Sequence, residues 1–241
     1  MPEGGSAKIA IVAALEREIR PLIAGWRVVR SAWDGREFRF FENQNAVAVC
    51  GGIGPVAARR ACEAVCASYH PEILISVGFA GALVASLKVG DIVVPEAVVD
   101  SSDGSVVATG SGSQRLVSVN EVATVKRKPL LAEKYRAVAV DMEAASVAKA
   151  AGLRGVRFAA VKVISDDAGF EIPVVEGSVD SQGRFHEGRF LAGISVRPWL
   201  WGRVTRLARN SGLASKNLSE YLQSRMETFG EPMAEVVSTK L

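Results

Sequence analysis

The sequence predicts an α/β protein, built in layers around a largely parallel central sheet. From Lys8 to about Asp166, short apolar runs alternate with stretches that carry apolar residues at helical spacing, as in layered α/β folds. The 241 residues, of which 49% are hydrophobic, suffice to bury one substantial core. We therefore expect one domain over residues 1–241, with a flexible N-terminus at 1–7 and a helical C-terminal extension at 196–241.

Apolar runs predict the strands, and several of them are bounded by turn residues. We expect two of the strands to form a pair that turns at Asn43 to Asn45, and one apolar run to end in the glycine-rich turn "GFAG". Strands are predicted at 8–15, 37–43, 45–50, 72–83, 90–100, 115–120, 136–140 and 156–165.

Helical spacing predicts helices between these strands: one from Glu16, one over 54–70, one around 121–134 and one after Asp141. Residues 101–114 are polar and carry no element in this prediction. The C-terminal third predicts helices joined by loops, and residues 169–190 are its least regular segment and the best candidate for a lid.

Composition excludes several classes of function. Lys and Arg number 29 against 26 Asp and Glu, and the resulting net charge of +3 does not predict a nucleic-acid partner. The N-terminus lacks a secretory signal pattern and no apolar run approaches a membrane span, so we expect a cytoplasmic protein.

Cysteine and histidine usage gives no support for a disulfide framework or a metal site. Cys62 and Cys66 lie four residues apart on a predicted helix and read as small buried hydrophobes, and Cys50 is the third cysteine. His70 and His186 stand outside the spacings typical of zinc ligands. We expect no metal and no cofactor.

Acidic residues follow several predicted strands, at the edge where open α/β sheets bind ligands. Glu18 lies beyond the first strand, Asp141 and Glu143 follow the strand at 136–140, and Asp166 and Asp167 end the strand at 156–165. Structure alone also explains such residues, because Asp is a favoured N-cap and carboxylates stabilise the first turn of a helix. For Asp141 and Glu143 taken by themselves, the structural interpretation is favoured.

The segment "GIGPVA" at 52–57 fits the outline of a dinucleotide-binding turn, G-x-G-x-x-A. The next strand, however, does not end in the acidic residue that would hold a ribose. Pro55 suits the first turn of a helix, so the structural interpretation is favoured for this loop.

Six segments, taken in order, resemble the purine and uridine phosphorylase superfamily, and within it most closely the methylthioadenosine/S-adenosylhomocysteine nucleosidases. The resemblance covers roughly Lys8 to Ala168 and is carried most specifically by "DMEA" and "ISD". It implies a three-layer α/β/α sandwich around a mixed, largely parallel sheet. The segments are "AALEREI", "GGIGPVAA", "SVGFAGAL", "KVGDIVVPE", "AVDMEAASVA" and "VKVISDDA".

The resemblance also implies roles for individual residues. Glu143 would bind the ribose hydroxyls while Met142 packs against the sugar, and Asp166 would protonate the purine. Glu18 would activate water, which favours hydrolysis over phosphorolysis because a carboxylate repels phosphate. If the reaction were phosphorolysis, inorganic phosphate would be the co-substrate.

Further substrate-binding positions follow from the same resemblance, with departures from the family pattern. Phe79 replaces the serine or threonine of the family's glycine turn, which also contains Gly81, and Lys162 replaces an arginine. Val122 and Ala123 stand where a base-stacking aromatic is expected, and Ser165 precedes Asp166.

The segment "RPWLWGRVTRLARNSGLA" predicts a basic amphipathic helix, for which packing on its own domain is favoured over peripheral membrane contact. This tail and the departures are also similar to hopanoid-associated phosphorylases or nucleosidases, which act on an adenosyl lipid. The resemblance implies a purine nucleoside as ligand and a homodimer or larger homo-oligomer. A non-catalytic nucleoside-binding module stays open as an alternative, and a nucleotide-cofactor oxidoreductase comes last. The helix would carry Leu200, Val204 and Leu207 on one face and Arg203, Arg206 and Arg209 elsewhere.

Overall fold

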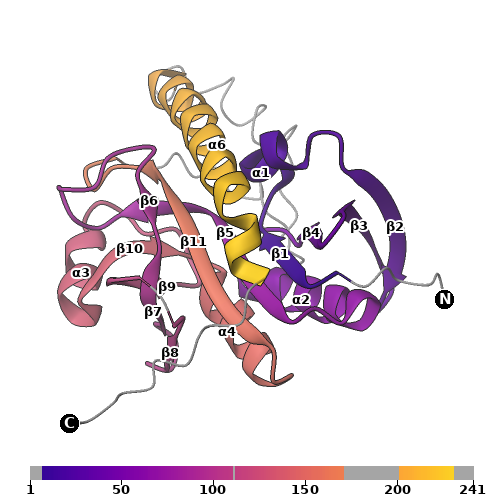
Figure 1. Cartoon of the computed structure of the whole chain (residues 1–241). Helices are drawn as coiled ribbons and strands as arrows, with labels where there is room; N and C mark the ends of the chain where they lie inside the picture. Colours follow the sequence, from indigo (N-terminus) through magenta and orange to yellow (C-terminus); the bar gives the residue numbers. More distant parts are fainter. Residues whose placement is uncertain (1–6, 111, 171–200, 231–241) are drawn as a thin grey trace, which may run out of the picture.

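A mixed β-sheet lies between two layers of helices in the computed structural model, which describes residues 7–110, 112–170 and 201–230 (Figure 1). The strands are β1 (Ile9–Ala13), β2 (Arg27–Trp33), β3 (Arg36–Asn43), β4 (Ala46–Cys50), β5 (Ile73–Ala82), β6 (Ile92–Val93), β7 (Pro95–Asp100), β8 (Val106–Ala108), β9 (Gln114–Ser118), β10 (Ala137–Asp141) and β11 (Arg157–Asp166). The helices are α1 (Glu16–Ile23), α2 (Pro55–Tyr69), α3 (Lys128–Tyr135), α4 (Ala144–Gly152) and α6 (Trp201–Gly230).

Strand β5 is the centre of the sheet. Its first half pairs in parallel with β1, its end at Gly81 and Ala82 pairs antiparallel with β10, and β11 runs parallel along nearly its whole length. Parallel pairs also join β1 to β4 and β9 to β7 and β10, whereas antiparallel pairs add β2, β3, β6 and β8. The carboxyl ends of β1, β5 and β11 therefore lie at one edge, with the end of β10 beside them.

Alternating side chains on the strands separate the two helical layers. Ala10 and Val12 of β1 pack with α2 and α4, whereas Ile9, Ile11 and Ala13 pack with α1 and α6. Figure 1 shows α6 crossing one face of the sheet next to α1, with α2 and α4 on the opposite side. The predicted three-layer α/β/α sandwich is thus confirmed.

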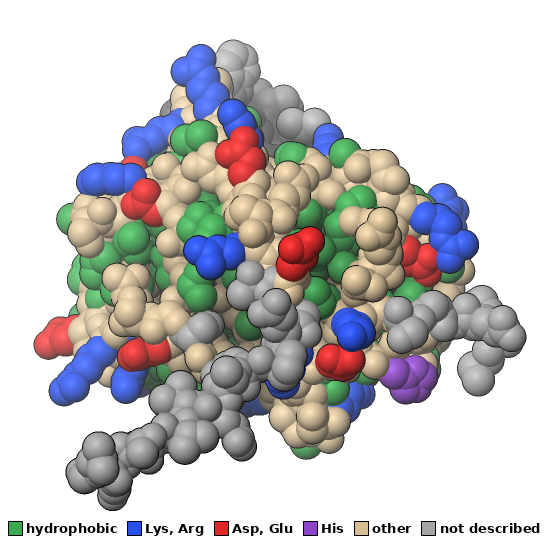
Figure 2. Space-filling model, viewed as in Figure 1, with side chains coloured by type: hydrophobic (Ala, Val, Ile, Leu, Met, Phe, Trp, Pro, Cys, Tyr) green, Lys and Arg blue, Asp and Glu red, His purple; other side chains and the backbone are tan. Residues whose placement is uncertain are grey.

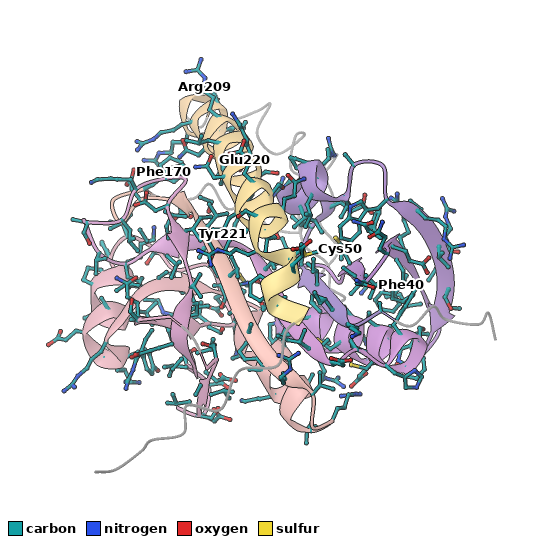
Figure 3. All side chains as sticks on the ribbon, viewed as in Figure 1. Phe40, Cys50, Phe170, Arg209, Glu220 and Tyr221 are labelled. Carbon is teal, nitrogen blue, oxygen red and sulfur yellow. The ribbon has the colours of Figure 1, made fainter. Side chains whose placement is uncertain are left out.

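Helix α6 falls within the segment predicted as a helical extension, and it packs on the rest of the chain. Ala214, Leu218 and Leu222 are fully buried against α1, β5 and β11. Arg209, by contrast, points away from the molecule near the start of the helix (Figure 3). The favoured interpretation of the basic amphipathic pattern, a helix packed on its own domain, agrees with this arrangement. Leu200, the lid candidate beyond residue 170 and the N-terminal residues up to 6, which were predicted to be flexible, lie outside the described residues.

Four local predictions differ from the structure. Strand β2 was not predicted because it is an edge strand whose side chains are mostly exposed, so it has no apolar pattern. Strand β8 lies inside the polar stretch at 101–114, where it pairs with the edge of β7. Helix α3 begins at Lys128 rather than near residue 121, with Pro129 in its first turn. Strand β5 continues through "GFAG" instead of turning there.

Candidate active site

A cavity of about 620 Å³ opens at the carboxyl ends of β1, β5, β10 and β11, and α1 and α6 close one side of it. Apart from Lys162, every residue predicted for the site lines this cavity: Glu18, Phe79, Gly81, Val122, Ala123, Met142, Glu143, Ser165 and Asp166. Segments that are far apart in sequence therefore meet around one space that is large enough for a small organic ligand.

Glu143 lies immediately before α4 and takes a backbone hydrogen bond from a distant loop. Its Oε1 accepts from the N–H of Gly54 at 2.7 Å, and its Oε2 accepts from the N–H of Met142 at 3.3 Å. Burial and the nearby charge of Asp141 raise the pKa of Glu143 to about 7, although Lys162 opposes the shift. This side chain lines the cavity and is fixed in position by the two backbone hydrogen bonds.

The "GIGPVA" loop has both a structural and a site role. Pro55 begins α2, as predicted, while Gly54 has a φ of +93° that directs its N–H to Glu143. Ile53 also lines the cavity. The purely structural interpretation of this loop is therefore incomplete, since its backbone positions a predicted site carboxylate.

The hydrogen bonds of Asp141 hold the start of α4. Its Oδ2 accepts from the N–H of Ala144 at 2.9 Å, and its Oδ1 accepts from the hydroxyl of Ser118, which in turn accepts from the N–H of Ala145. Two free N–H groups at the helix N-terminus are satisfied in this way. The predicted capping role of Asp141 agrees with these bonds.

Lys162 lies beneath the cavity, so its predicted direct contact with substrate needs correction. Its Nζ is 2.9 Å from Asp141 Oδ2 and donates to the hydroxyl of Ser76 and the carbonyl of Val77. Burial lowers the pKa of Lys162, but the charges of Asp141 and Glu143 outweigh that effect and the pKa is raised overall. Lys162 does not line the cavity and acts on it through Asp141 and its positive charge.

Glu18 is buried at the base of α1 and packs against the second half of β5. Burial, followed by the charge of Glu143, raises its pKa to about 8, while Lys162 and Arg17 oppose the shift. A side chain at Gly78 would meet it, because an added Cβ would lie 2.5 Å from Glu18 Oε2. A carboxylate with such a pKa is suited to take a proton near neutral pH.

Asp166 ends β11 with its carboxylate against Gly81, whose Cβ, if present, would lie 2.9 Å from Oδ2. The hydroxyl of Ser165 donates to Oδ1 at 2.8 Å, and the Nζ of Lys128 lies 2.6 Å from Oδ2. The two glycines of "GFAG" thus make room for the two predicted catalytic carboxylates, Glu18 at Gly78 and Asp166 at Gly81.

Lys128 is the residue that the sequence analysis missed. It is 1% exposed, lines the cavity and pairs with Asp166 across 38 positions of sequence. One signal pointed to it: Lys128 is the first residue of α3, where the helix dipole disfavours a cation, so a lysine there requires another partner.

The remaining cavity wall is mostly apolar. Phe79, Val122 and Ala123 lie on it with Val119 and Val140, and Phe79 also packs toward the α1 and α6 side of the sheet. Helix α6 contributes Val204 and Leu207, and α1 contributes Pro21. Such a wall suits the faces of a flat ring and an apolar substituent.

Charged side chains outside the cavity do not form one basic face in the view of Figure 2, where Asp and Glu lie between most of the Lys and Arg. Among residues 7–110, 112–170 and 201–230, no group of three or more His, Cys, Asp or Glu side chains is arranged to hold a metal ion. Over the same residues, no helix is long and apolar enough to cross a membrane.

Comparison with known proteins identifies relatives of the whole site-bearing region. The family model of the phosphorylase superfamily matches residues 8–124 and 106–184. A 5'-methylthioadenosine/S-adenosylhomocysteine nucleosidase of Marinomonas sp. (strain MWYL1) is 29% identical over 203 residues, which cover 68% of this chain and 88% of the relative. An enzyme of the same name from Shewanella sp. (strain MR-7) is 27% identical over 218 residues, covering 74% and 92%.

Solved structures share the fold at lower identity. The 5'-methylthioadenosine/S-adenosylhomocysteine nucleosidase of Helicobacter pylori superposes with a TM-score of 0.70 at 19% identity, covering 93% of this chain and 99% of that one. The futalosine hydrolase of the same species gives 0.69 at 19% identity, covering 92% and 98%. Since the family model spans most of the chain, this protein belongs to the phosphorylase superfamily.

Proposed function

We propose that the protein cleaves the N-glycosidic bond of a 5′-substituted purine nucleoside by hydrolysis, with adenine as the leaving base. The observation that carries this proposal is the meeting of Glu18, Glu143 and Asp166 around one cavity, from α1, the residue before α4 and the end of β11. Relatives named as nucleosidases for methylthioadenosine and adenosylhomocysteine support the same class of substrate.

Each carboxylate has a separate role in the proposed reaction. Glu143 accepts hydrogen bonds from the ribose hydroxyls, and its negative charge stabilises the positive charge that develops on the sugar as the bond to the base breaks. Glu18 takes a proton from the attacking water, a role that fits its pKa of about 8. The base lies at the Asp166 end, between the apolar groups of Phe79 and Val122.

The 5′ substituent would occupy the part of the cavity bounded by α1 and α6. Pro21, Val204 and Leu207 line it there. An apolar group bound on this wall would contribute about 25 cal/mol for each Å² that it removes from water. We therefore expect methylthioadenosine to be a better substrate than adenosine.

Phosphorolysis is the second candidate, because Arg17 and Arg20 of α1 line the same cavity and could attract an anion. Glu18 speaks against it, because it lies deeper than these exposed arginines and, whenever it is ionised to accept a proton, its negative charge would repel phosphate at the point of attack. Hydrolysis is therefore the first choice.

The experiment is an assay of free base with methylthioadenosine, adenosylhomocysteine, adenosine and inosine, each with and without phosphate. Adenine release that is independent of phosphate is the expected result. Release that requires phosphate would establish the phosphorylase instead. If nothing reacts while the nucleosides still bind, and Glu143→Ala abolishes that binding, the protein is a nucleoside-binding module.

Two further properties stay predictions. We propose that the protein forms a homodimer or larger homo-oligomer and works in the cytoplasm, as the family resemblance implies. Light scattering of the purified chain checks the first, because a monomer at all concentrations would contradict it. Fractionation of cells that express the protein checks the second.

A further inference from the structure

Lys128 makes three polar contacts from a position that is almost closed to solvent. Its Nζ donates to Asp166 Oδ2 at 2.6 Å, to the carbonyl oxygen of Asp167 at 2.8 Å and to that of Phe170 at 3.4 Å. A lysine ammonium has three N–H donors, and here each has an acceptor. These contacts fit a charged, protonated Lys128 with no hydrogen left over.

Both carboxylate oxygens of Asp166 accept a hydrogen bond. Lys128 donates to Oδ2, and the hydroxyl of Ser165 donates to Oδ1 at 2.8 Å. A carboxylate has about four lone-pair positions, so acceptor capacity remains toward the cavity that Asp166 lines. The proton expected to reach the leaving base is therefore present in the pair, but it is bound to nitrogen rather than to the carboxyl group.

We propose that Lys128 is a positioning residue that orients Asp166 and stores the proton which the leaving base requires. This inference rests on the proposed nucleoside cleavage and adds to it a proton source for the base. Asp166 remains the group that touches the base, and Lys128 acts through it.

The proton moves together with cleavage of the glycosidic bond. As the bond between C1′ and the base nitrogen breaks, its electron pair stays on the base, and a proton passes from Nζ through the Asp166 carboxylate to a ring nitrogen. The base leaves neutral and the pair becomes a neutral amine beside a carboxylate. Glu18 meanwhile holds the proton taken from water, and the return of that proton to Lys128 resets the site.

Other charged side chains lie beside the pair and on the rest of the cavity wall. Asp167 carries a charge next to it, but its side chain is paired with Arg206 of α6 at 2.5 Å, and Arg206 also lies over the ring of Phe170. The other charged residues that line the cavity are Arg17, Glu18, Arg20, Asp141 and Glu143.

The test is the pH profile of kcat for adenine release by the wild-type chain and Lys128→Met. Without Lys128 the proton must sit on the carboxyl group itself, and a carboxylic acid loses its proton at lower pH than an ammonium group does. We expect kcat to fall by about 10²-fold, within the usual range for general acid catalysis. The alkaline limb should move to lower pH by at least about one unit, with little change in KM.

Lys128→Gln guards against a folding defect, because its amide can still donate to Asp166 but has no proton to transfer. It should reproduce the shifted profile of Lys128→Met. Lys149→Met is the matched control: Lys149 also pairs with aspartates, Asp100 and Asp103, but lies outside the cavity. Its profile should equal that of the wild type.

A parallel loss of rate with an unchanged pH profile in both Lys128 variants would overturn the inference, because a purely structural lysine lowers the rate equally at every pH. Wild-type rates in either variant would overturn it too. Failure of the proposed function is distinguishable, since the wild-type chain would then release no base from any of the four nucleosides.

Discussion

Two buried lysine–aspartate pairs lie at this cavity, and they differ in what else their atoms bind. In the pair of Lys162 and Asp141, the lysine also bonds Ser76 and Val77, and both aspartate oxygens are occupied by Ser118 and the start of α4. Asp141 lines the cavity but Lys162 does not, whereas in the pair of Lys128 and Asp166 both partners line it.

This difference distinguishes a lysine–aspartate pair with a structural role from one that can act on a ligand. The first pair is closed: both oxygens of its aspartate bond to the protein, and it holds the start of α4, directly after Glu143. The second pair is open: it adjoins the space that a ligand would fill. Burial and ion pairing alone do not reveal which role a pair has, so its unused acceptors must also be traced.

The largest effect expected is on folding stability, from Lys162→Met. Removing the lysine leaves Asp141 buried without its cation, which costs about 3–5 kcal/mol when one partner of a buried pair is lost. Urea unfolding measures the loss. Lys128→Met should cost less, because the Asp166 side chain, although only 1% exposed, borders the cavity, from which water can solvate it once the lysine is removed. Equal losses in the two variants would contradict the distinction between the closed and open pairs.

Gly81→Ala tests the open pair by crowding it. The new Cβ would lie 2.9 Å from Asp166 Oδ2, the atom that also contacts Lys128, so the carboxylate must shift. We expect kcat to fall by about 10²-fold, because a displacement of about 1 Å in a reacting group has this order of effect.

The control for this prediction is Gly152→Ala at the end of α4, where an added Cβ meets nothing within 4 Å. Steady-state kinetics of both variants should show the loss at Gly81 alone. A fully active Gly81→Ala variant would mean that the position of Asp166 does not matter to the reaction.

The two cavity carboxylates Glu18 and Glu143 predict that the stability of the fold depends on pH. The pKa of Glu18 is raised to about 8 and that of Glu143 to about 7, both above the ordinary 4.5. The folded chain therefore binds more protons than the unfolded chain between about pH 4.5 and 8. Their contribution to stability is present below pH 4.5 and is lost as the pH rises to about 8.

Thermal unfolding from pH 5 to pH 9 checks this. Because the amide introduced by Glu18→Gln does not ionise, this variant should show a weaker decline and be more stable than the wild type at pH 9. If the two chains lose stability in parallel across this range, Glu18 does not titrate as described.

The smallest effect is expected from Lys149→Met, at a pair that water reaches. The side chain of Lys149 is 38% exposed, and exposed pairs contribute about 0.2–1 kcal/mol each. Urea unfolding should show a loss near this range, several-fold below that of Lys162→Met. A loss as large as at Lys162 would mean that burial does not distinguish the pairs.

The layered fold could be predicted because β1, β4, β5, β10 and β11 are mostly buried and mostly apolar. It could not predict β2, whose exposed side chains form no pattern, or the continuation of β5 through "GFAG". In that strand the glycines leave space for the carboxylates of Glu18 and Asp166 and do not form a turn. Only the packing of these two side chains reveals this.

The site residues could be predicted where an acidic residue lies at or shortly after the end of a strand, as Glu18, Glu143 and Asp166 do. Groups that contact these carboxylates from distant segments of the chain were not predicted. Lys128 contacts Asp166 only because the loop before α3 returns to the end of β11, and the Gly54 N–H reaches Glu143 across 89 positions. Neither contact leaves a local pattern of residues. The oligomer and the site roles of individual residues stay predictions.

Hydrolysis with Glu18 as the base is tested by following both products of methylthioadenosine cleavage in phosphate-free buffer, for the wild type and Glu18→Gln. We predict free adenine and a free 5-substituted ribose from the wild type, and a kcat lower by about 10³-fold in the variant, because water loses its general base. Cleavage that requires phosphate and yields a ribose 1-phosphate, or a Glu18→Gln variant with wild-type kcat, would contradict hydrolysis by water activated at Glu18.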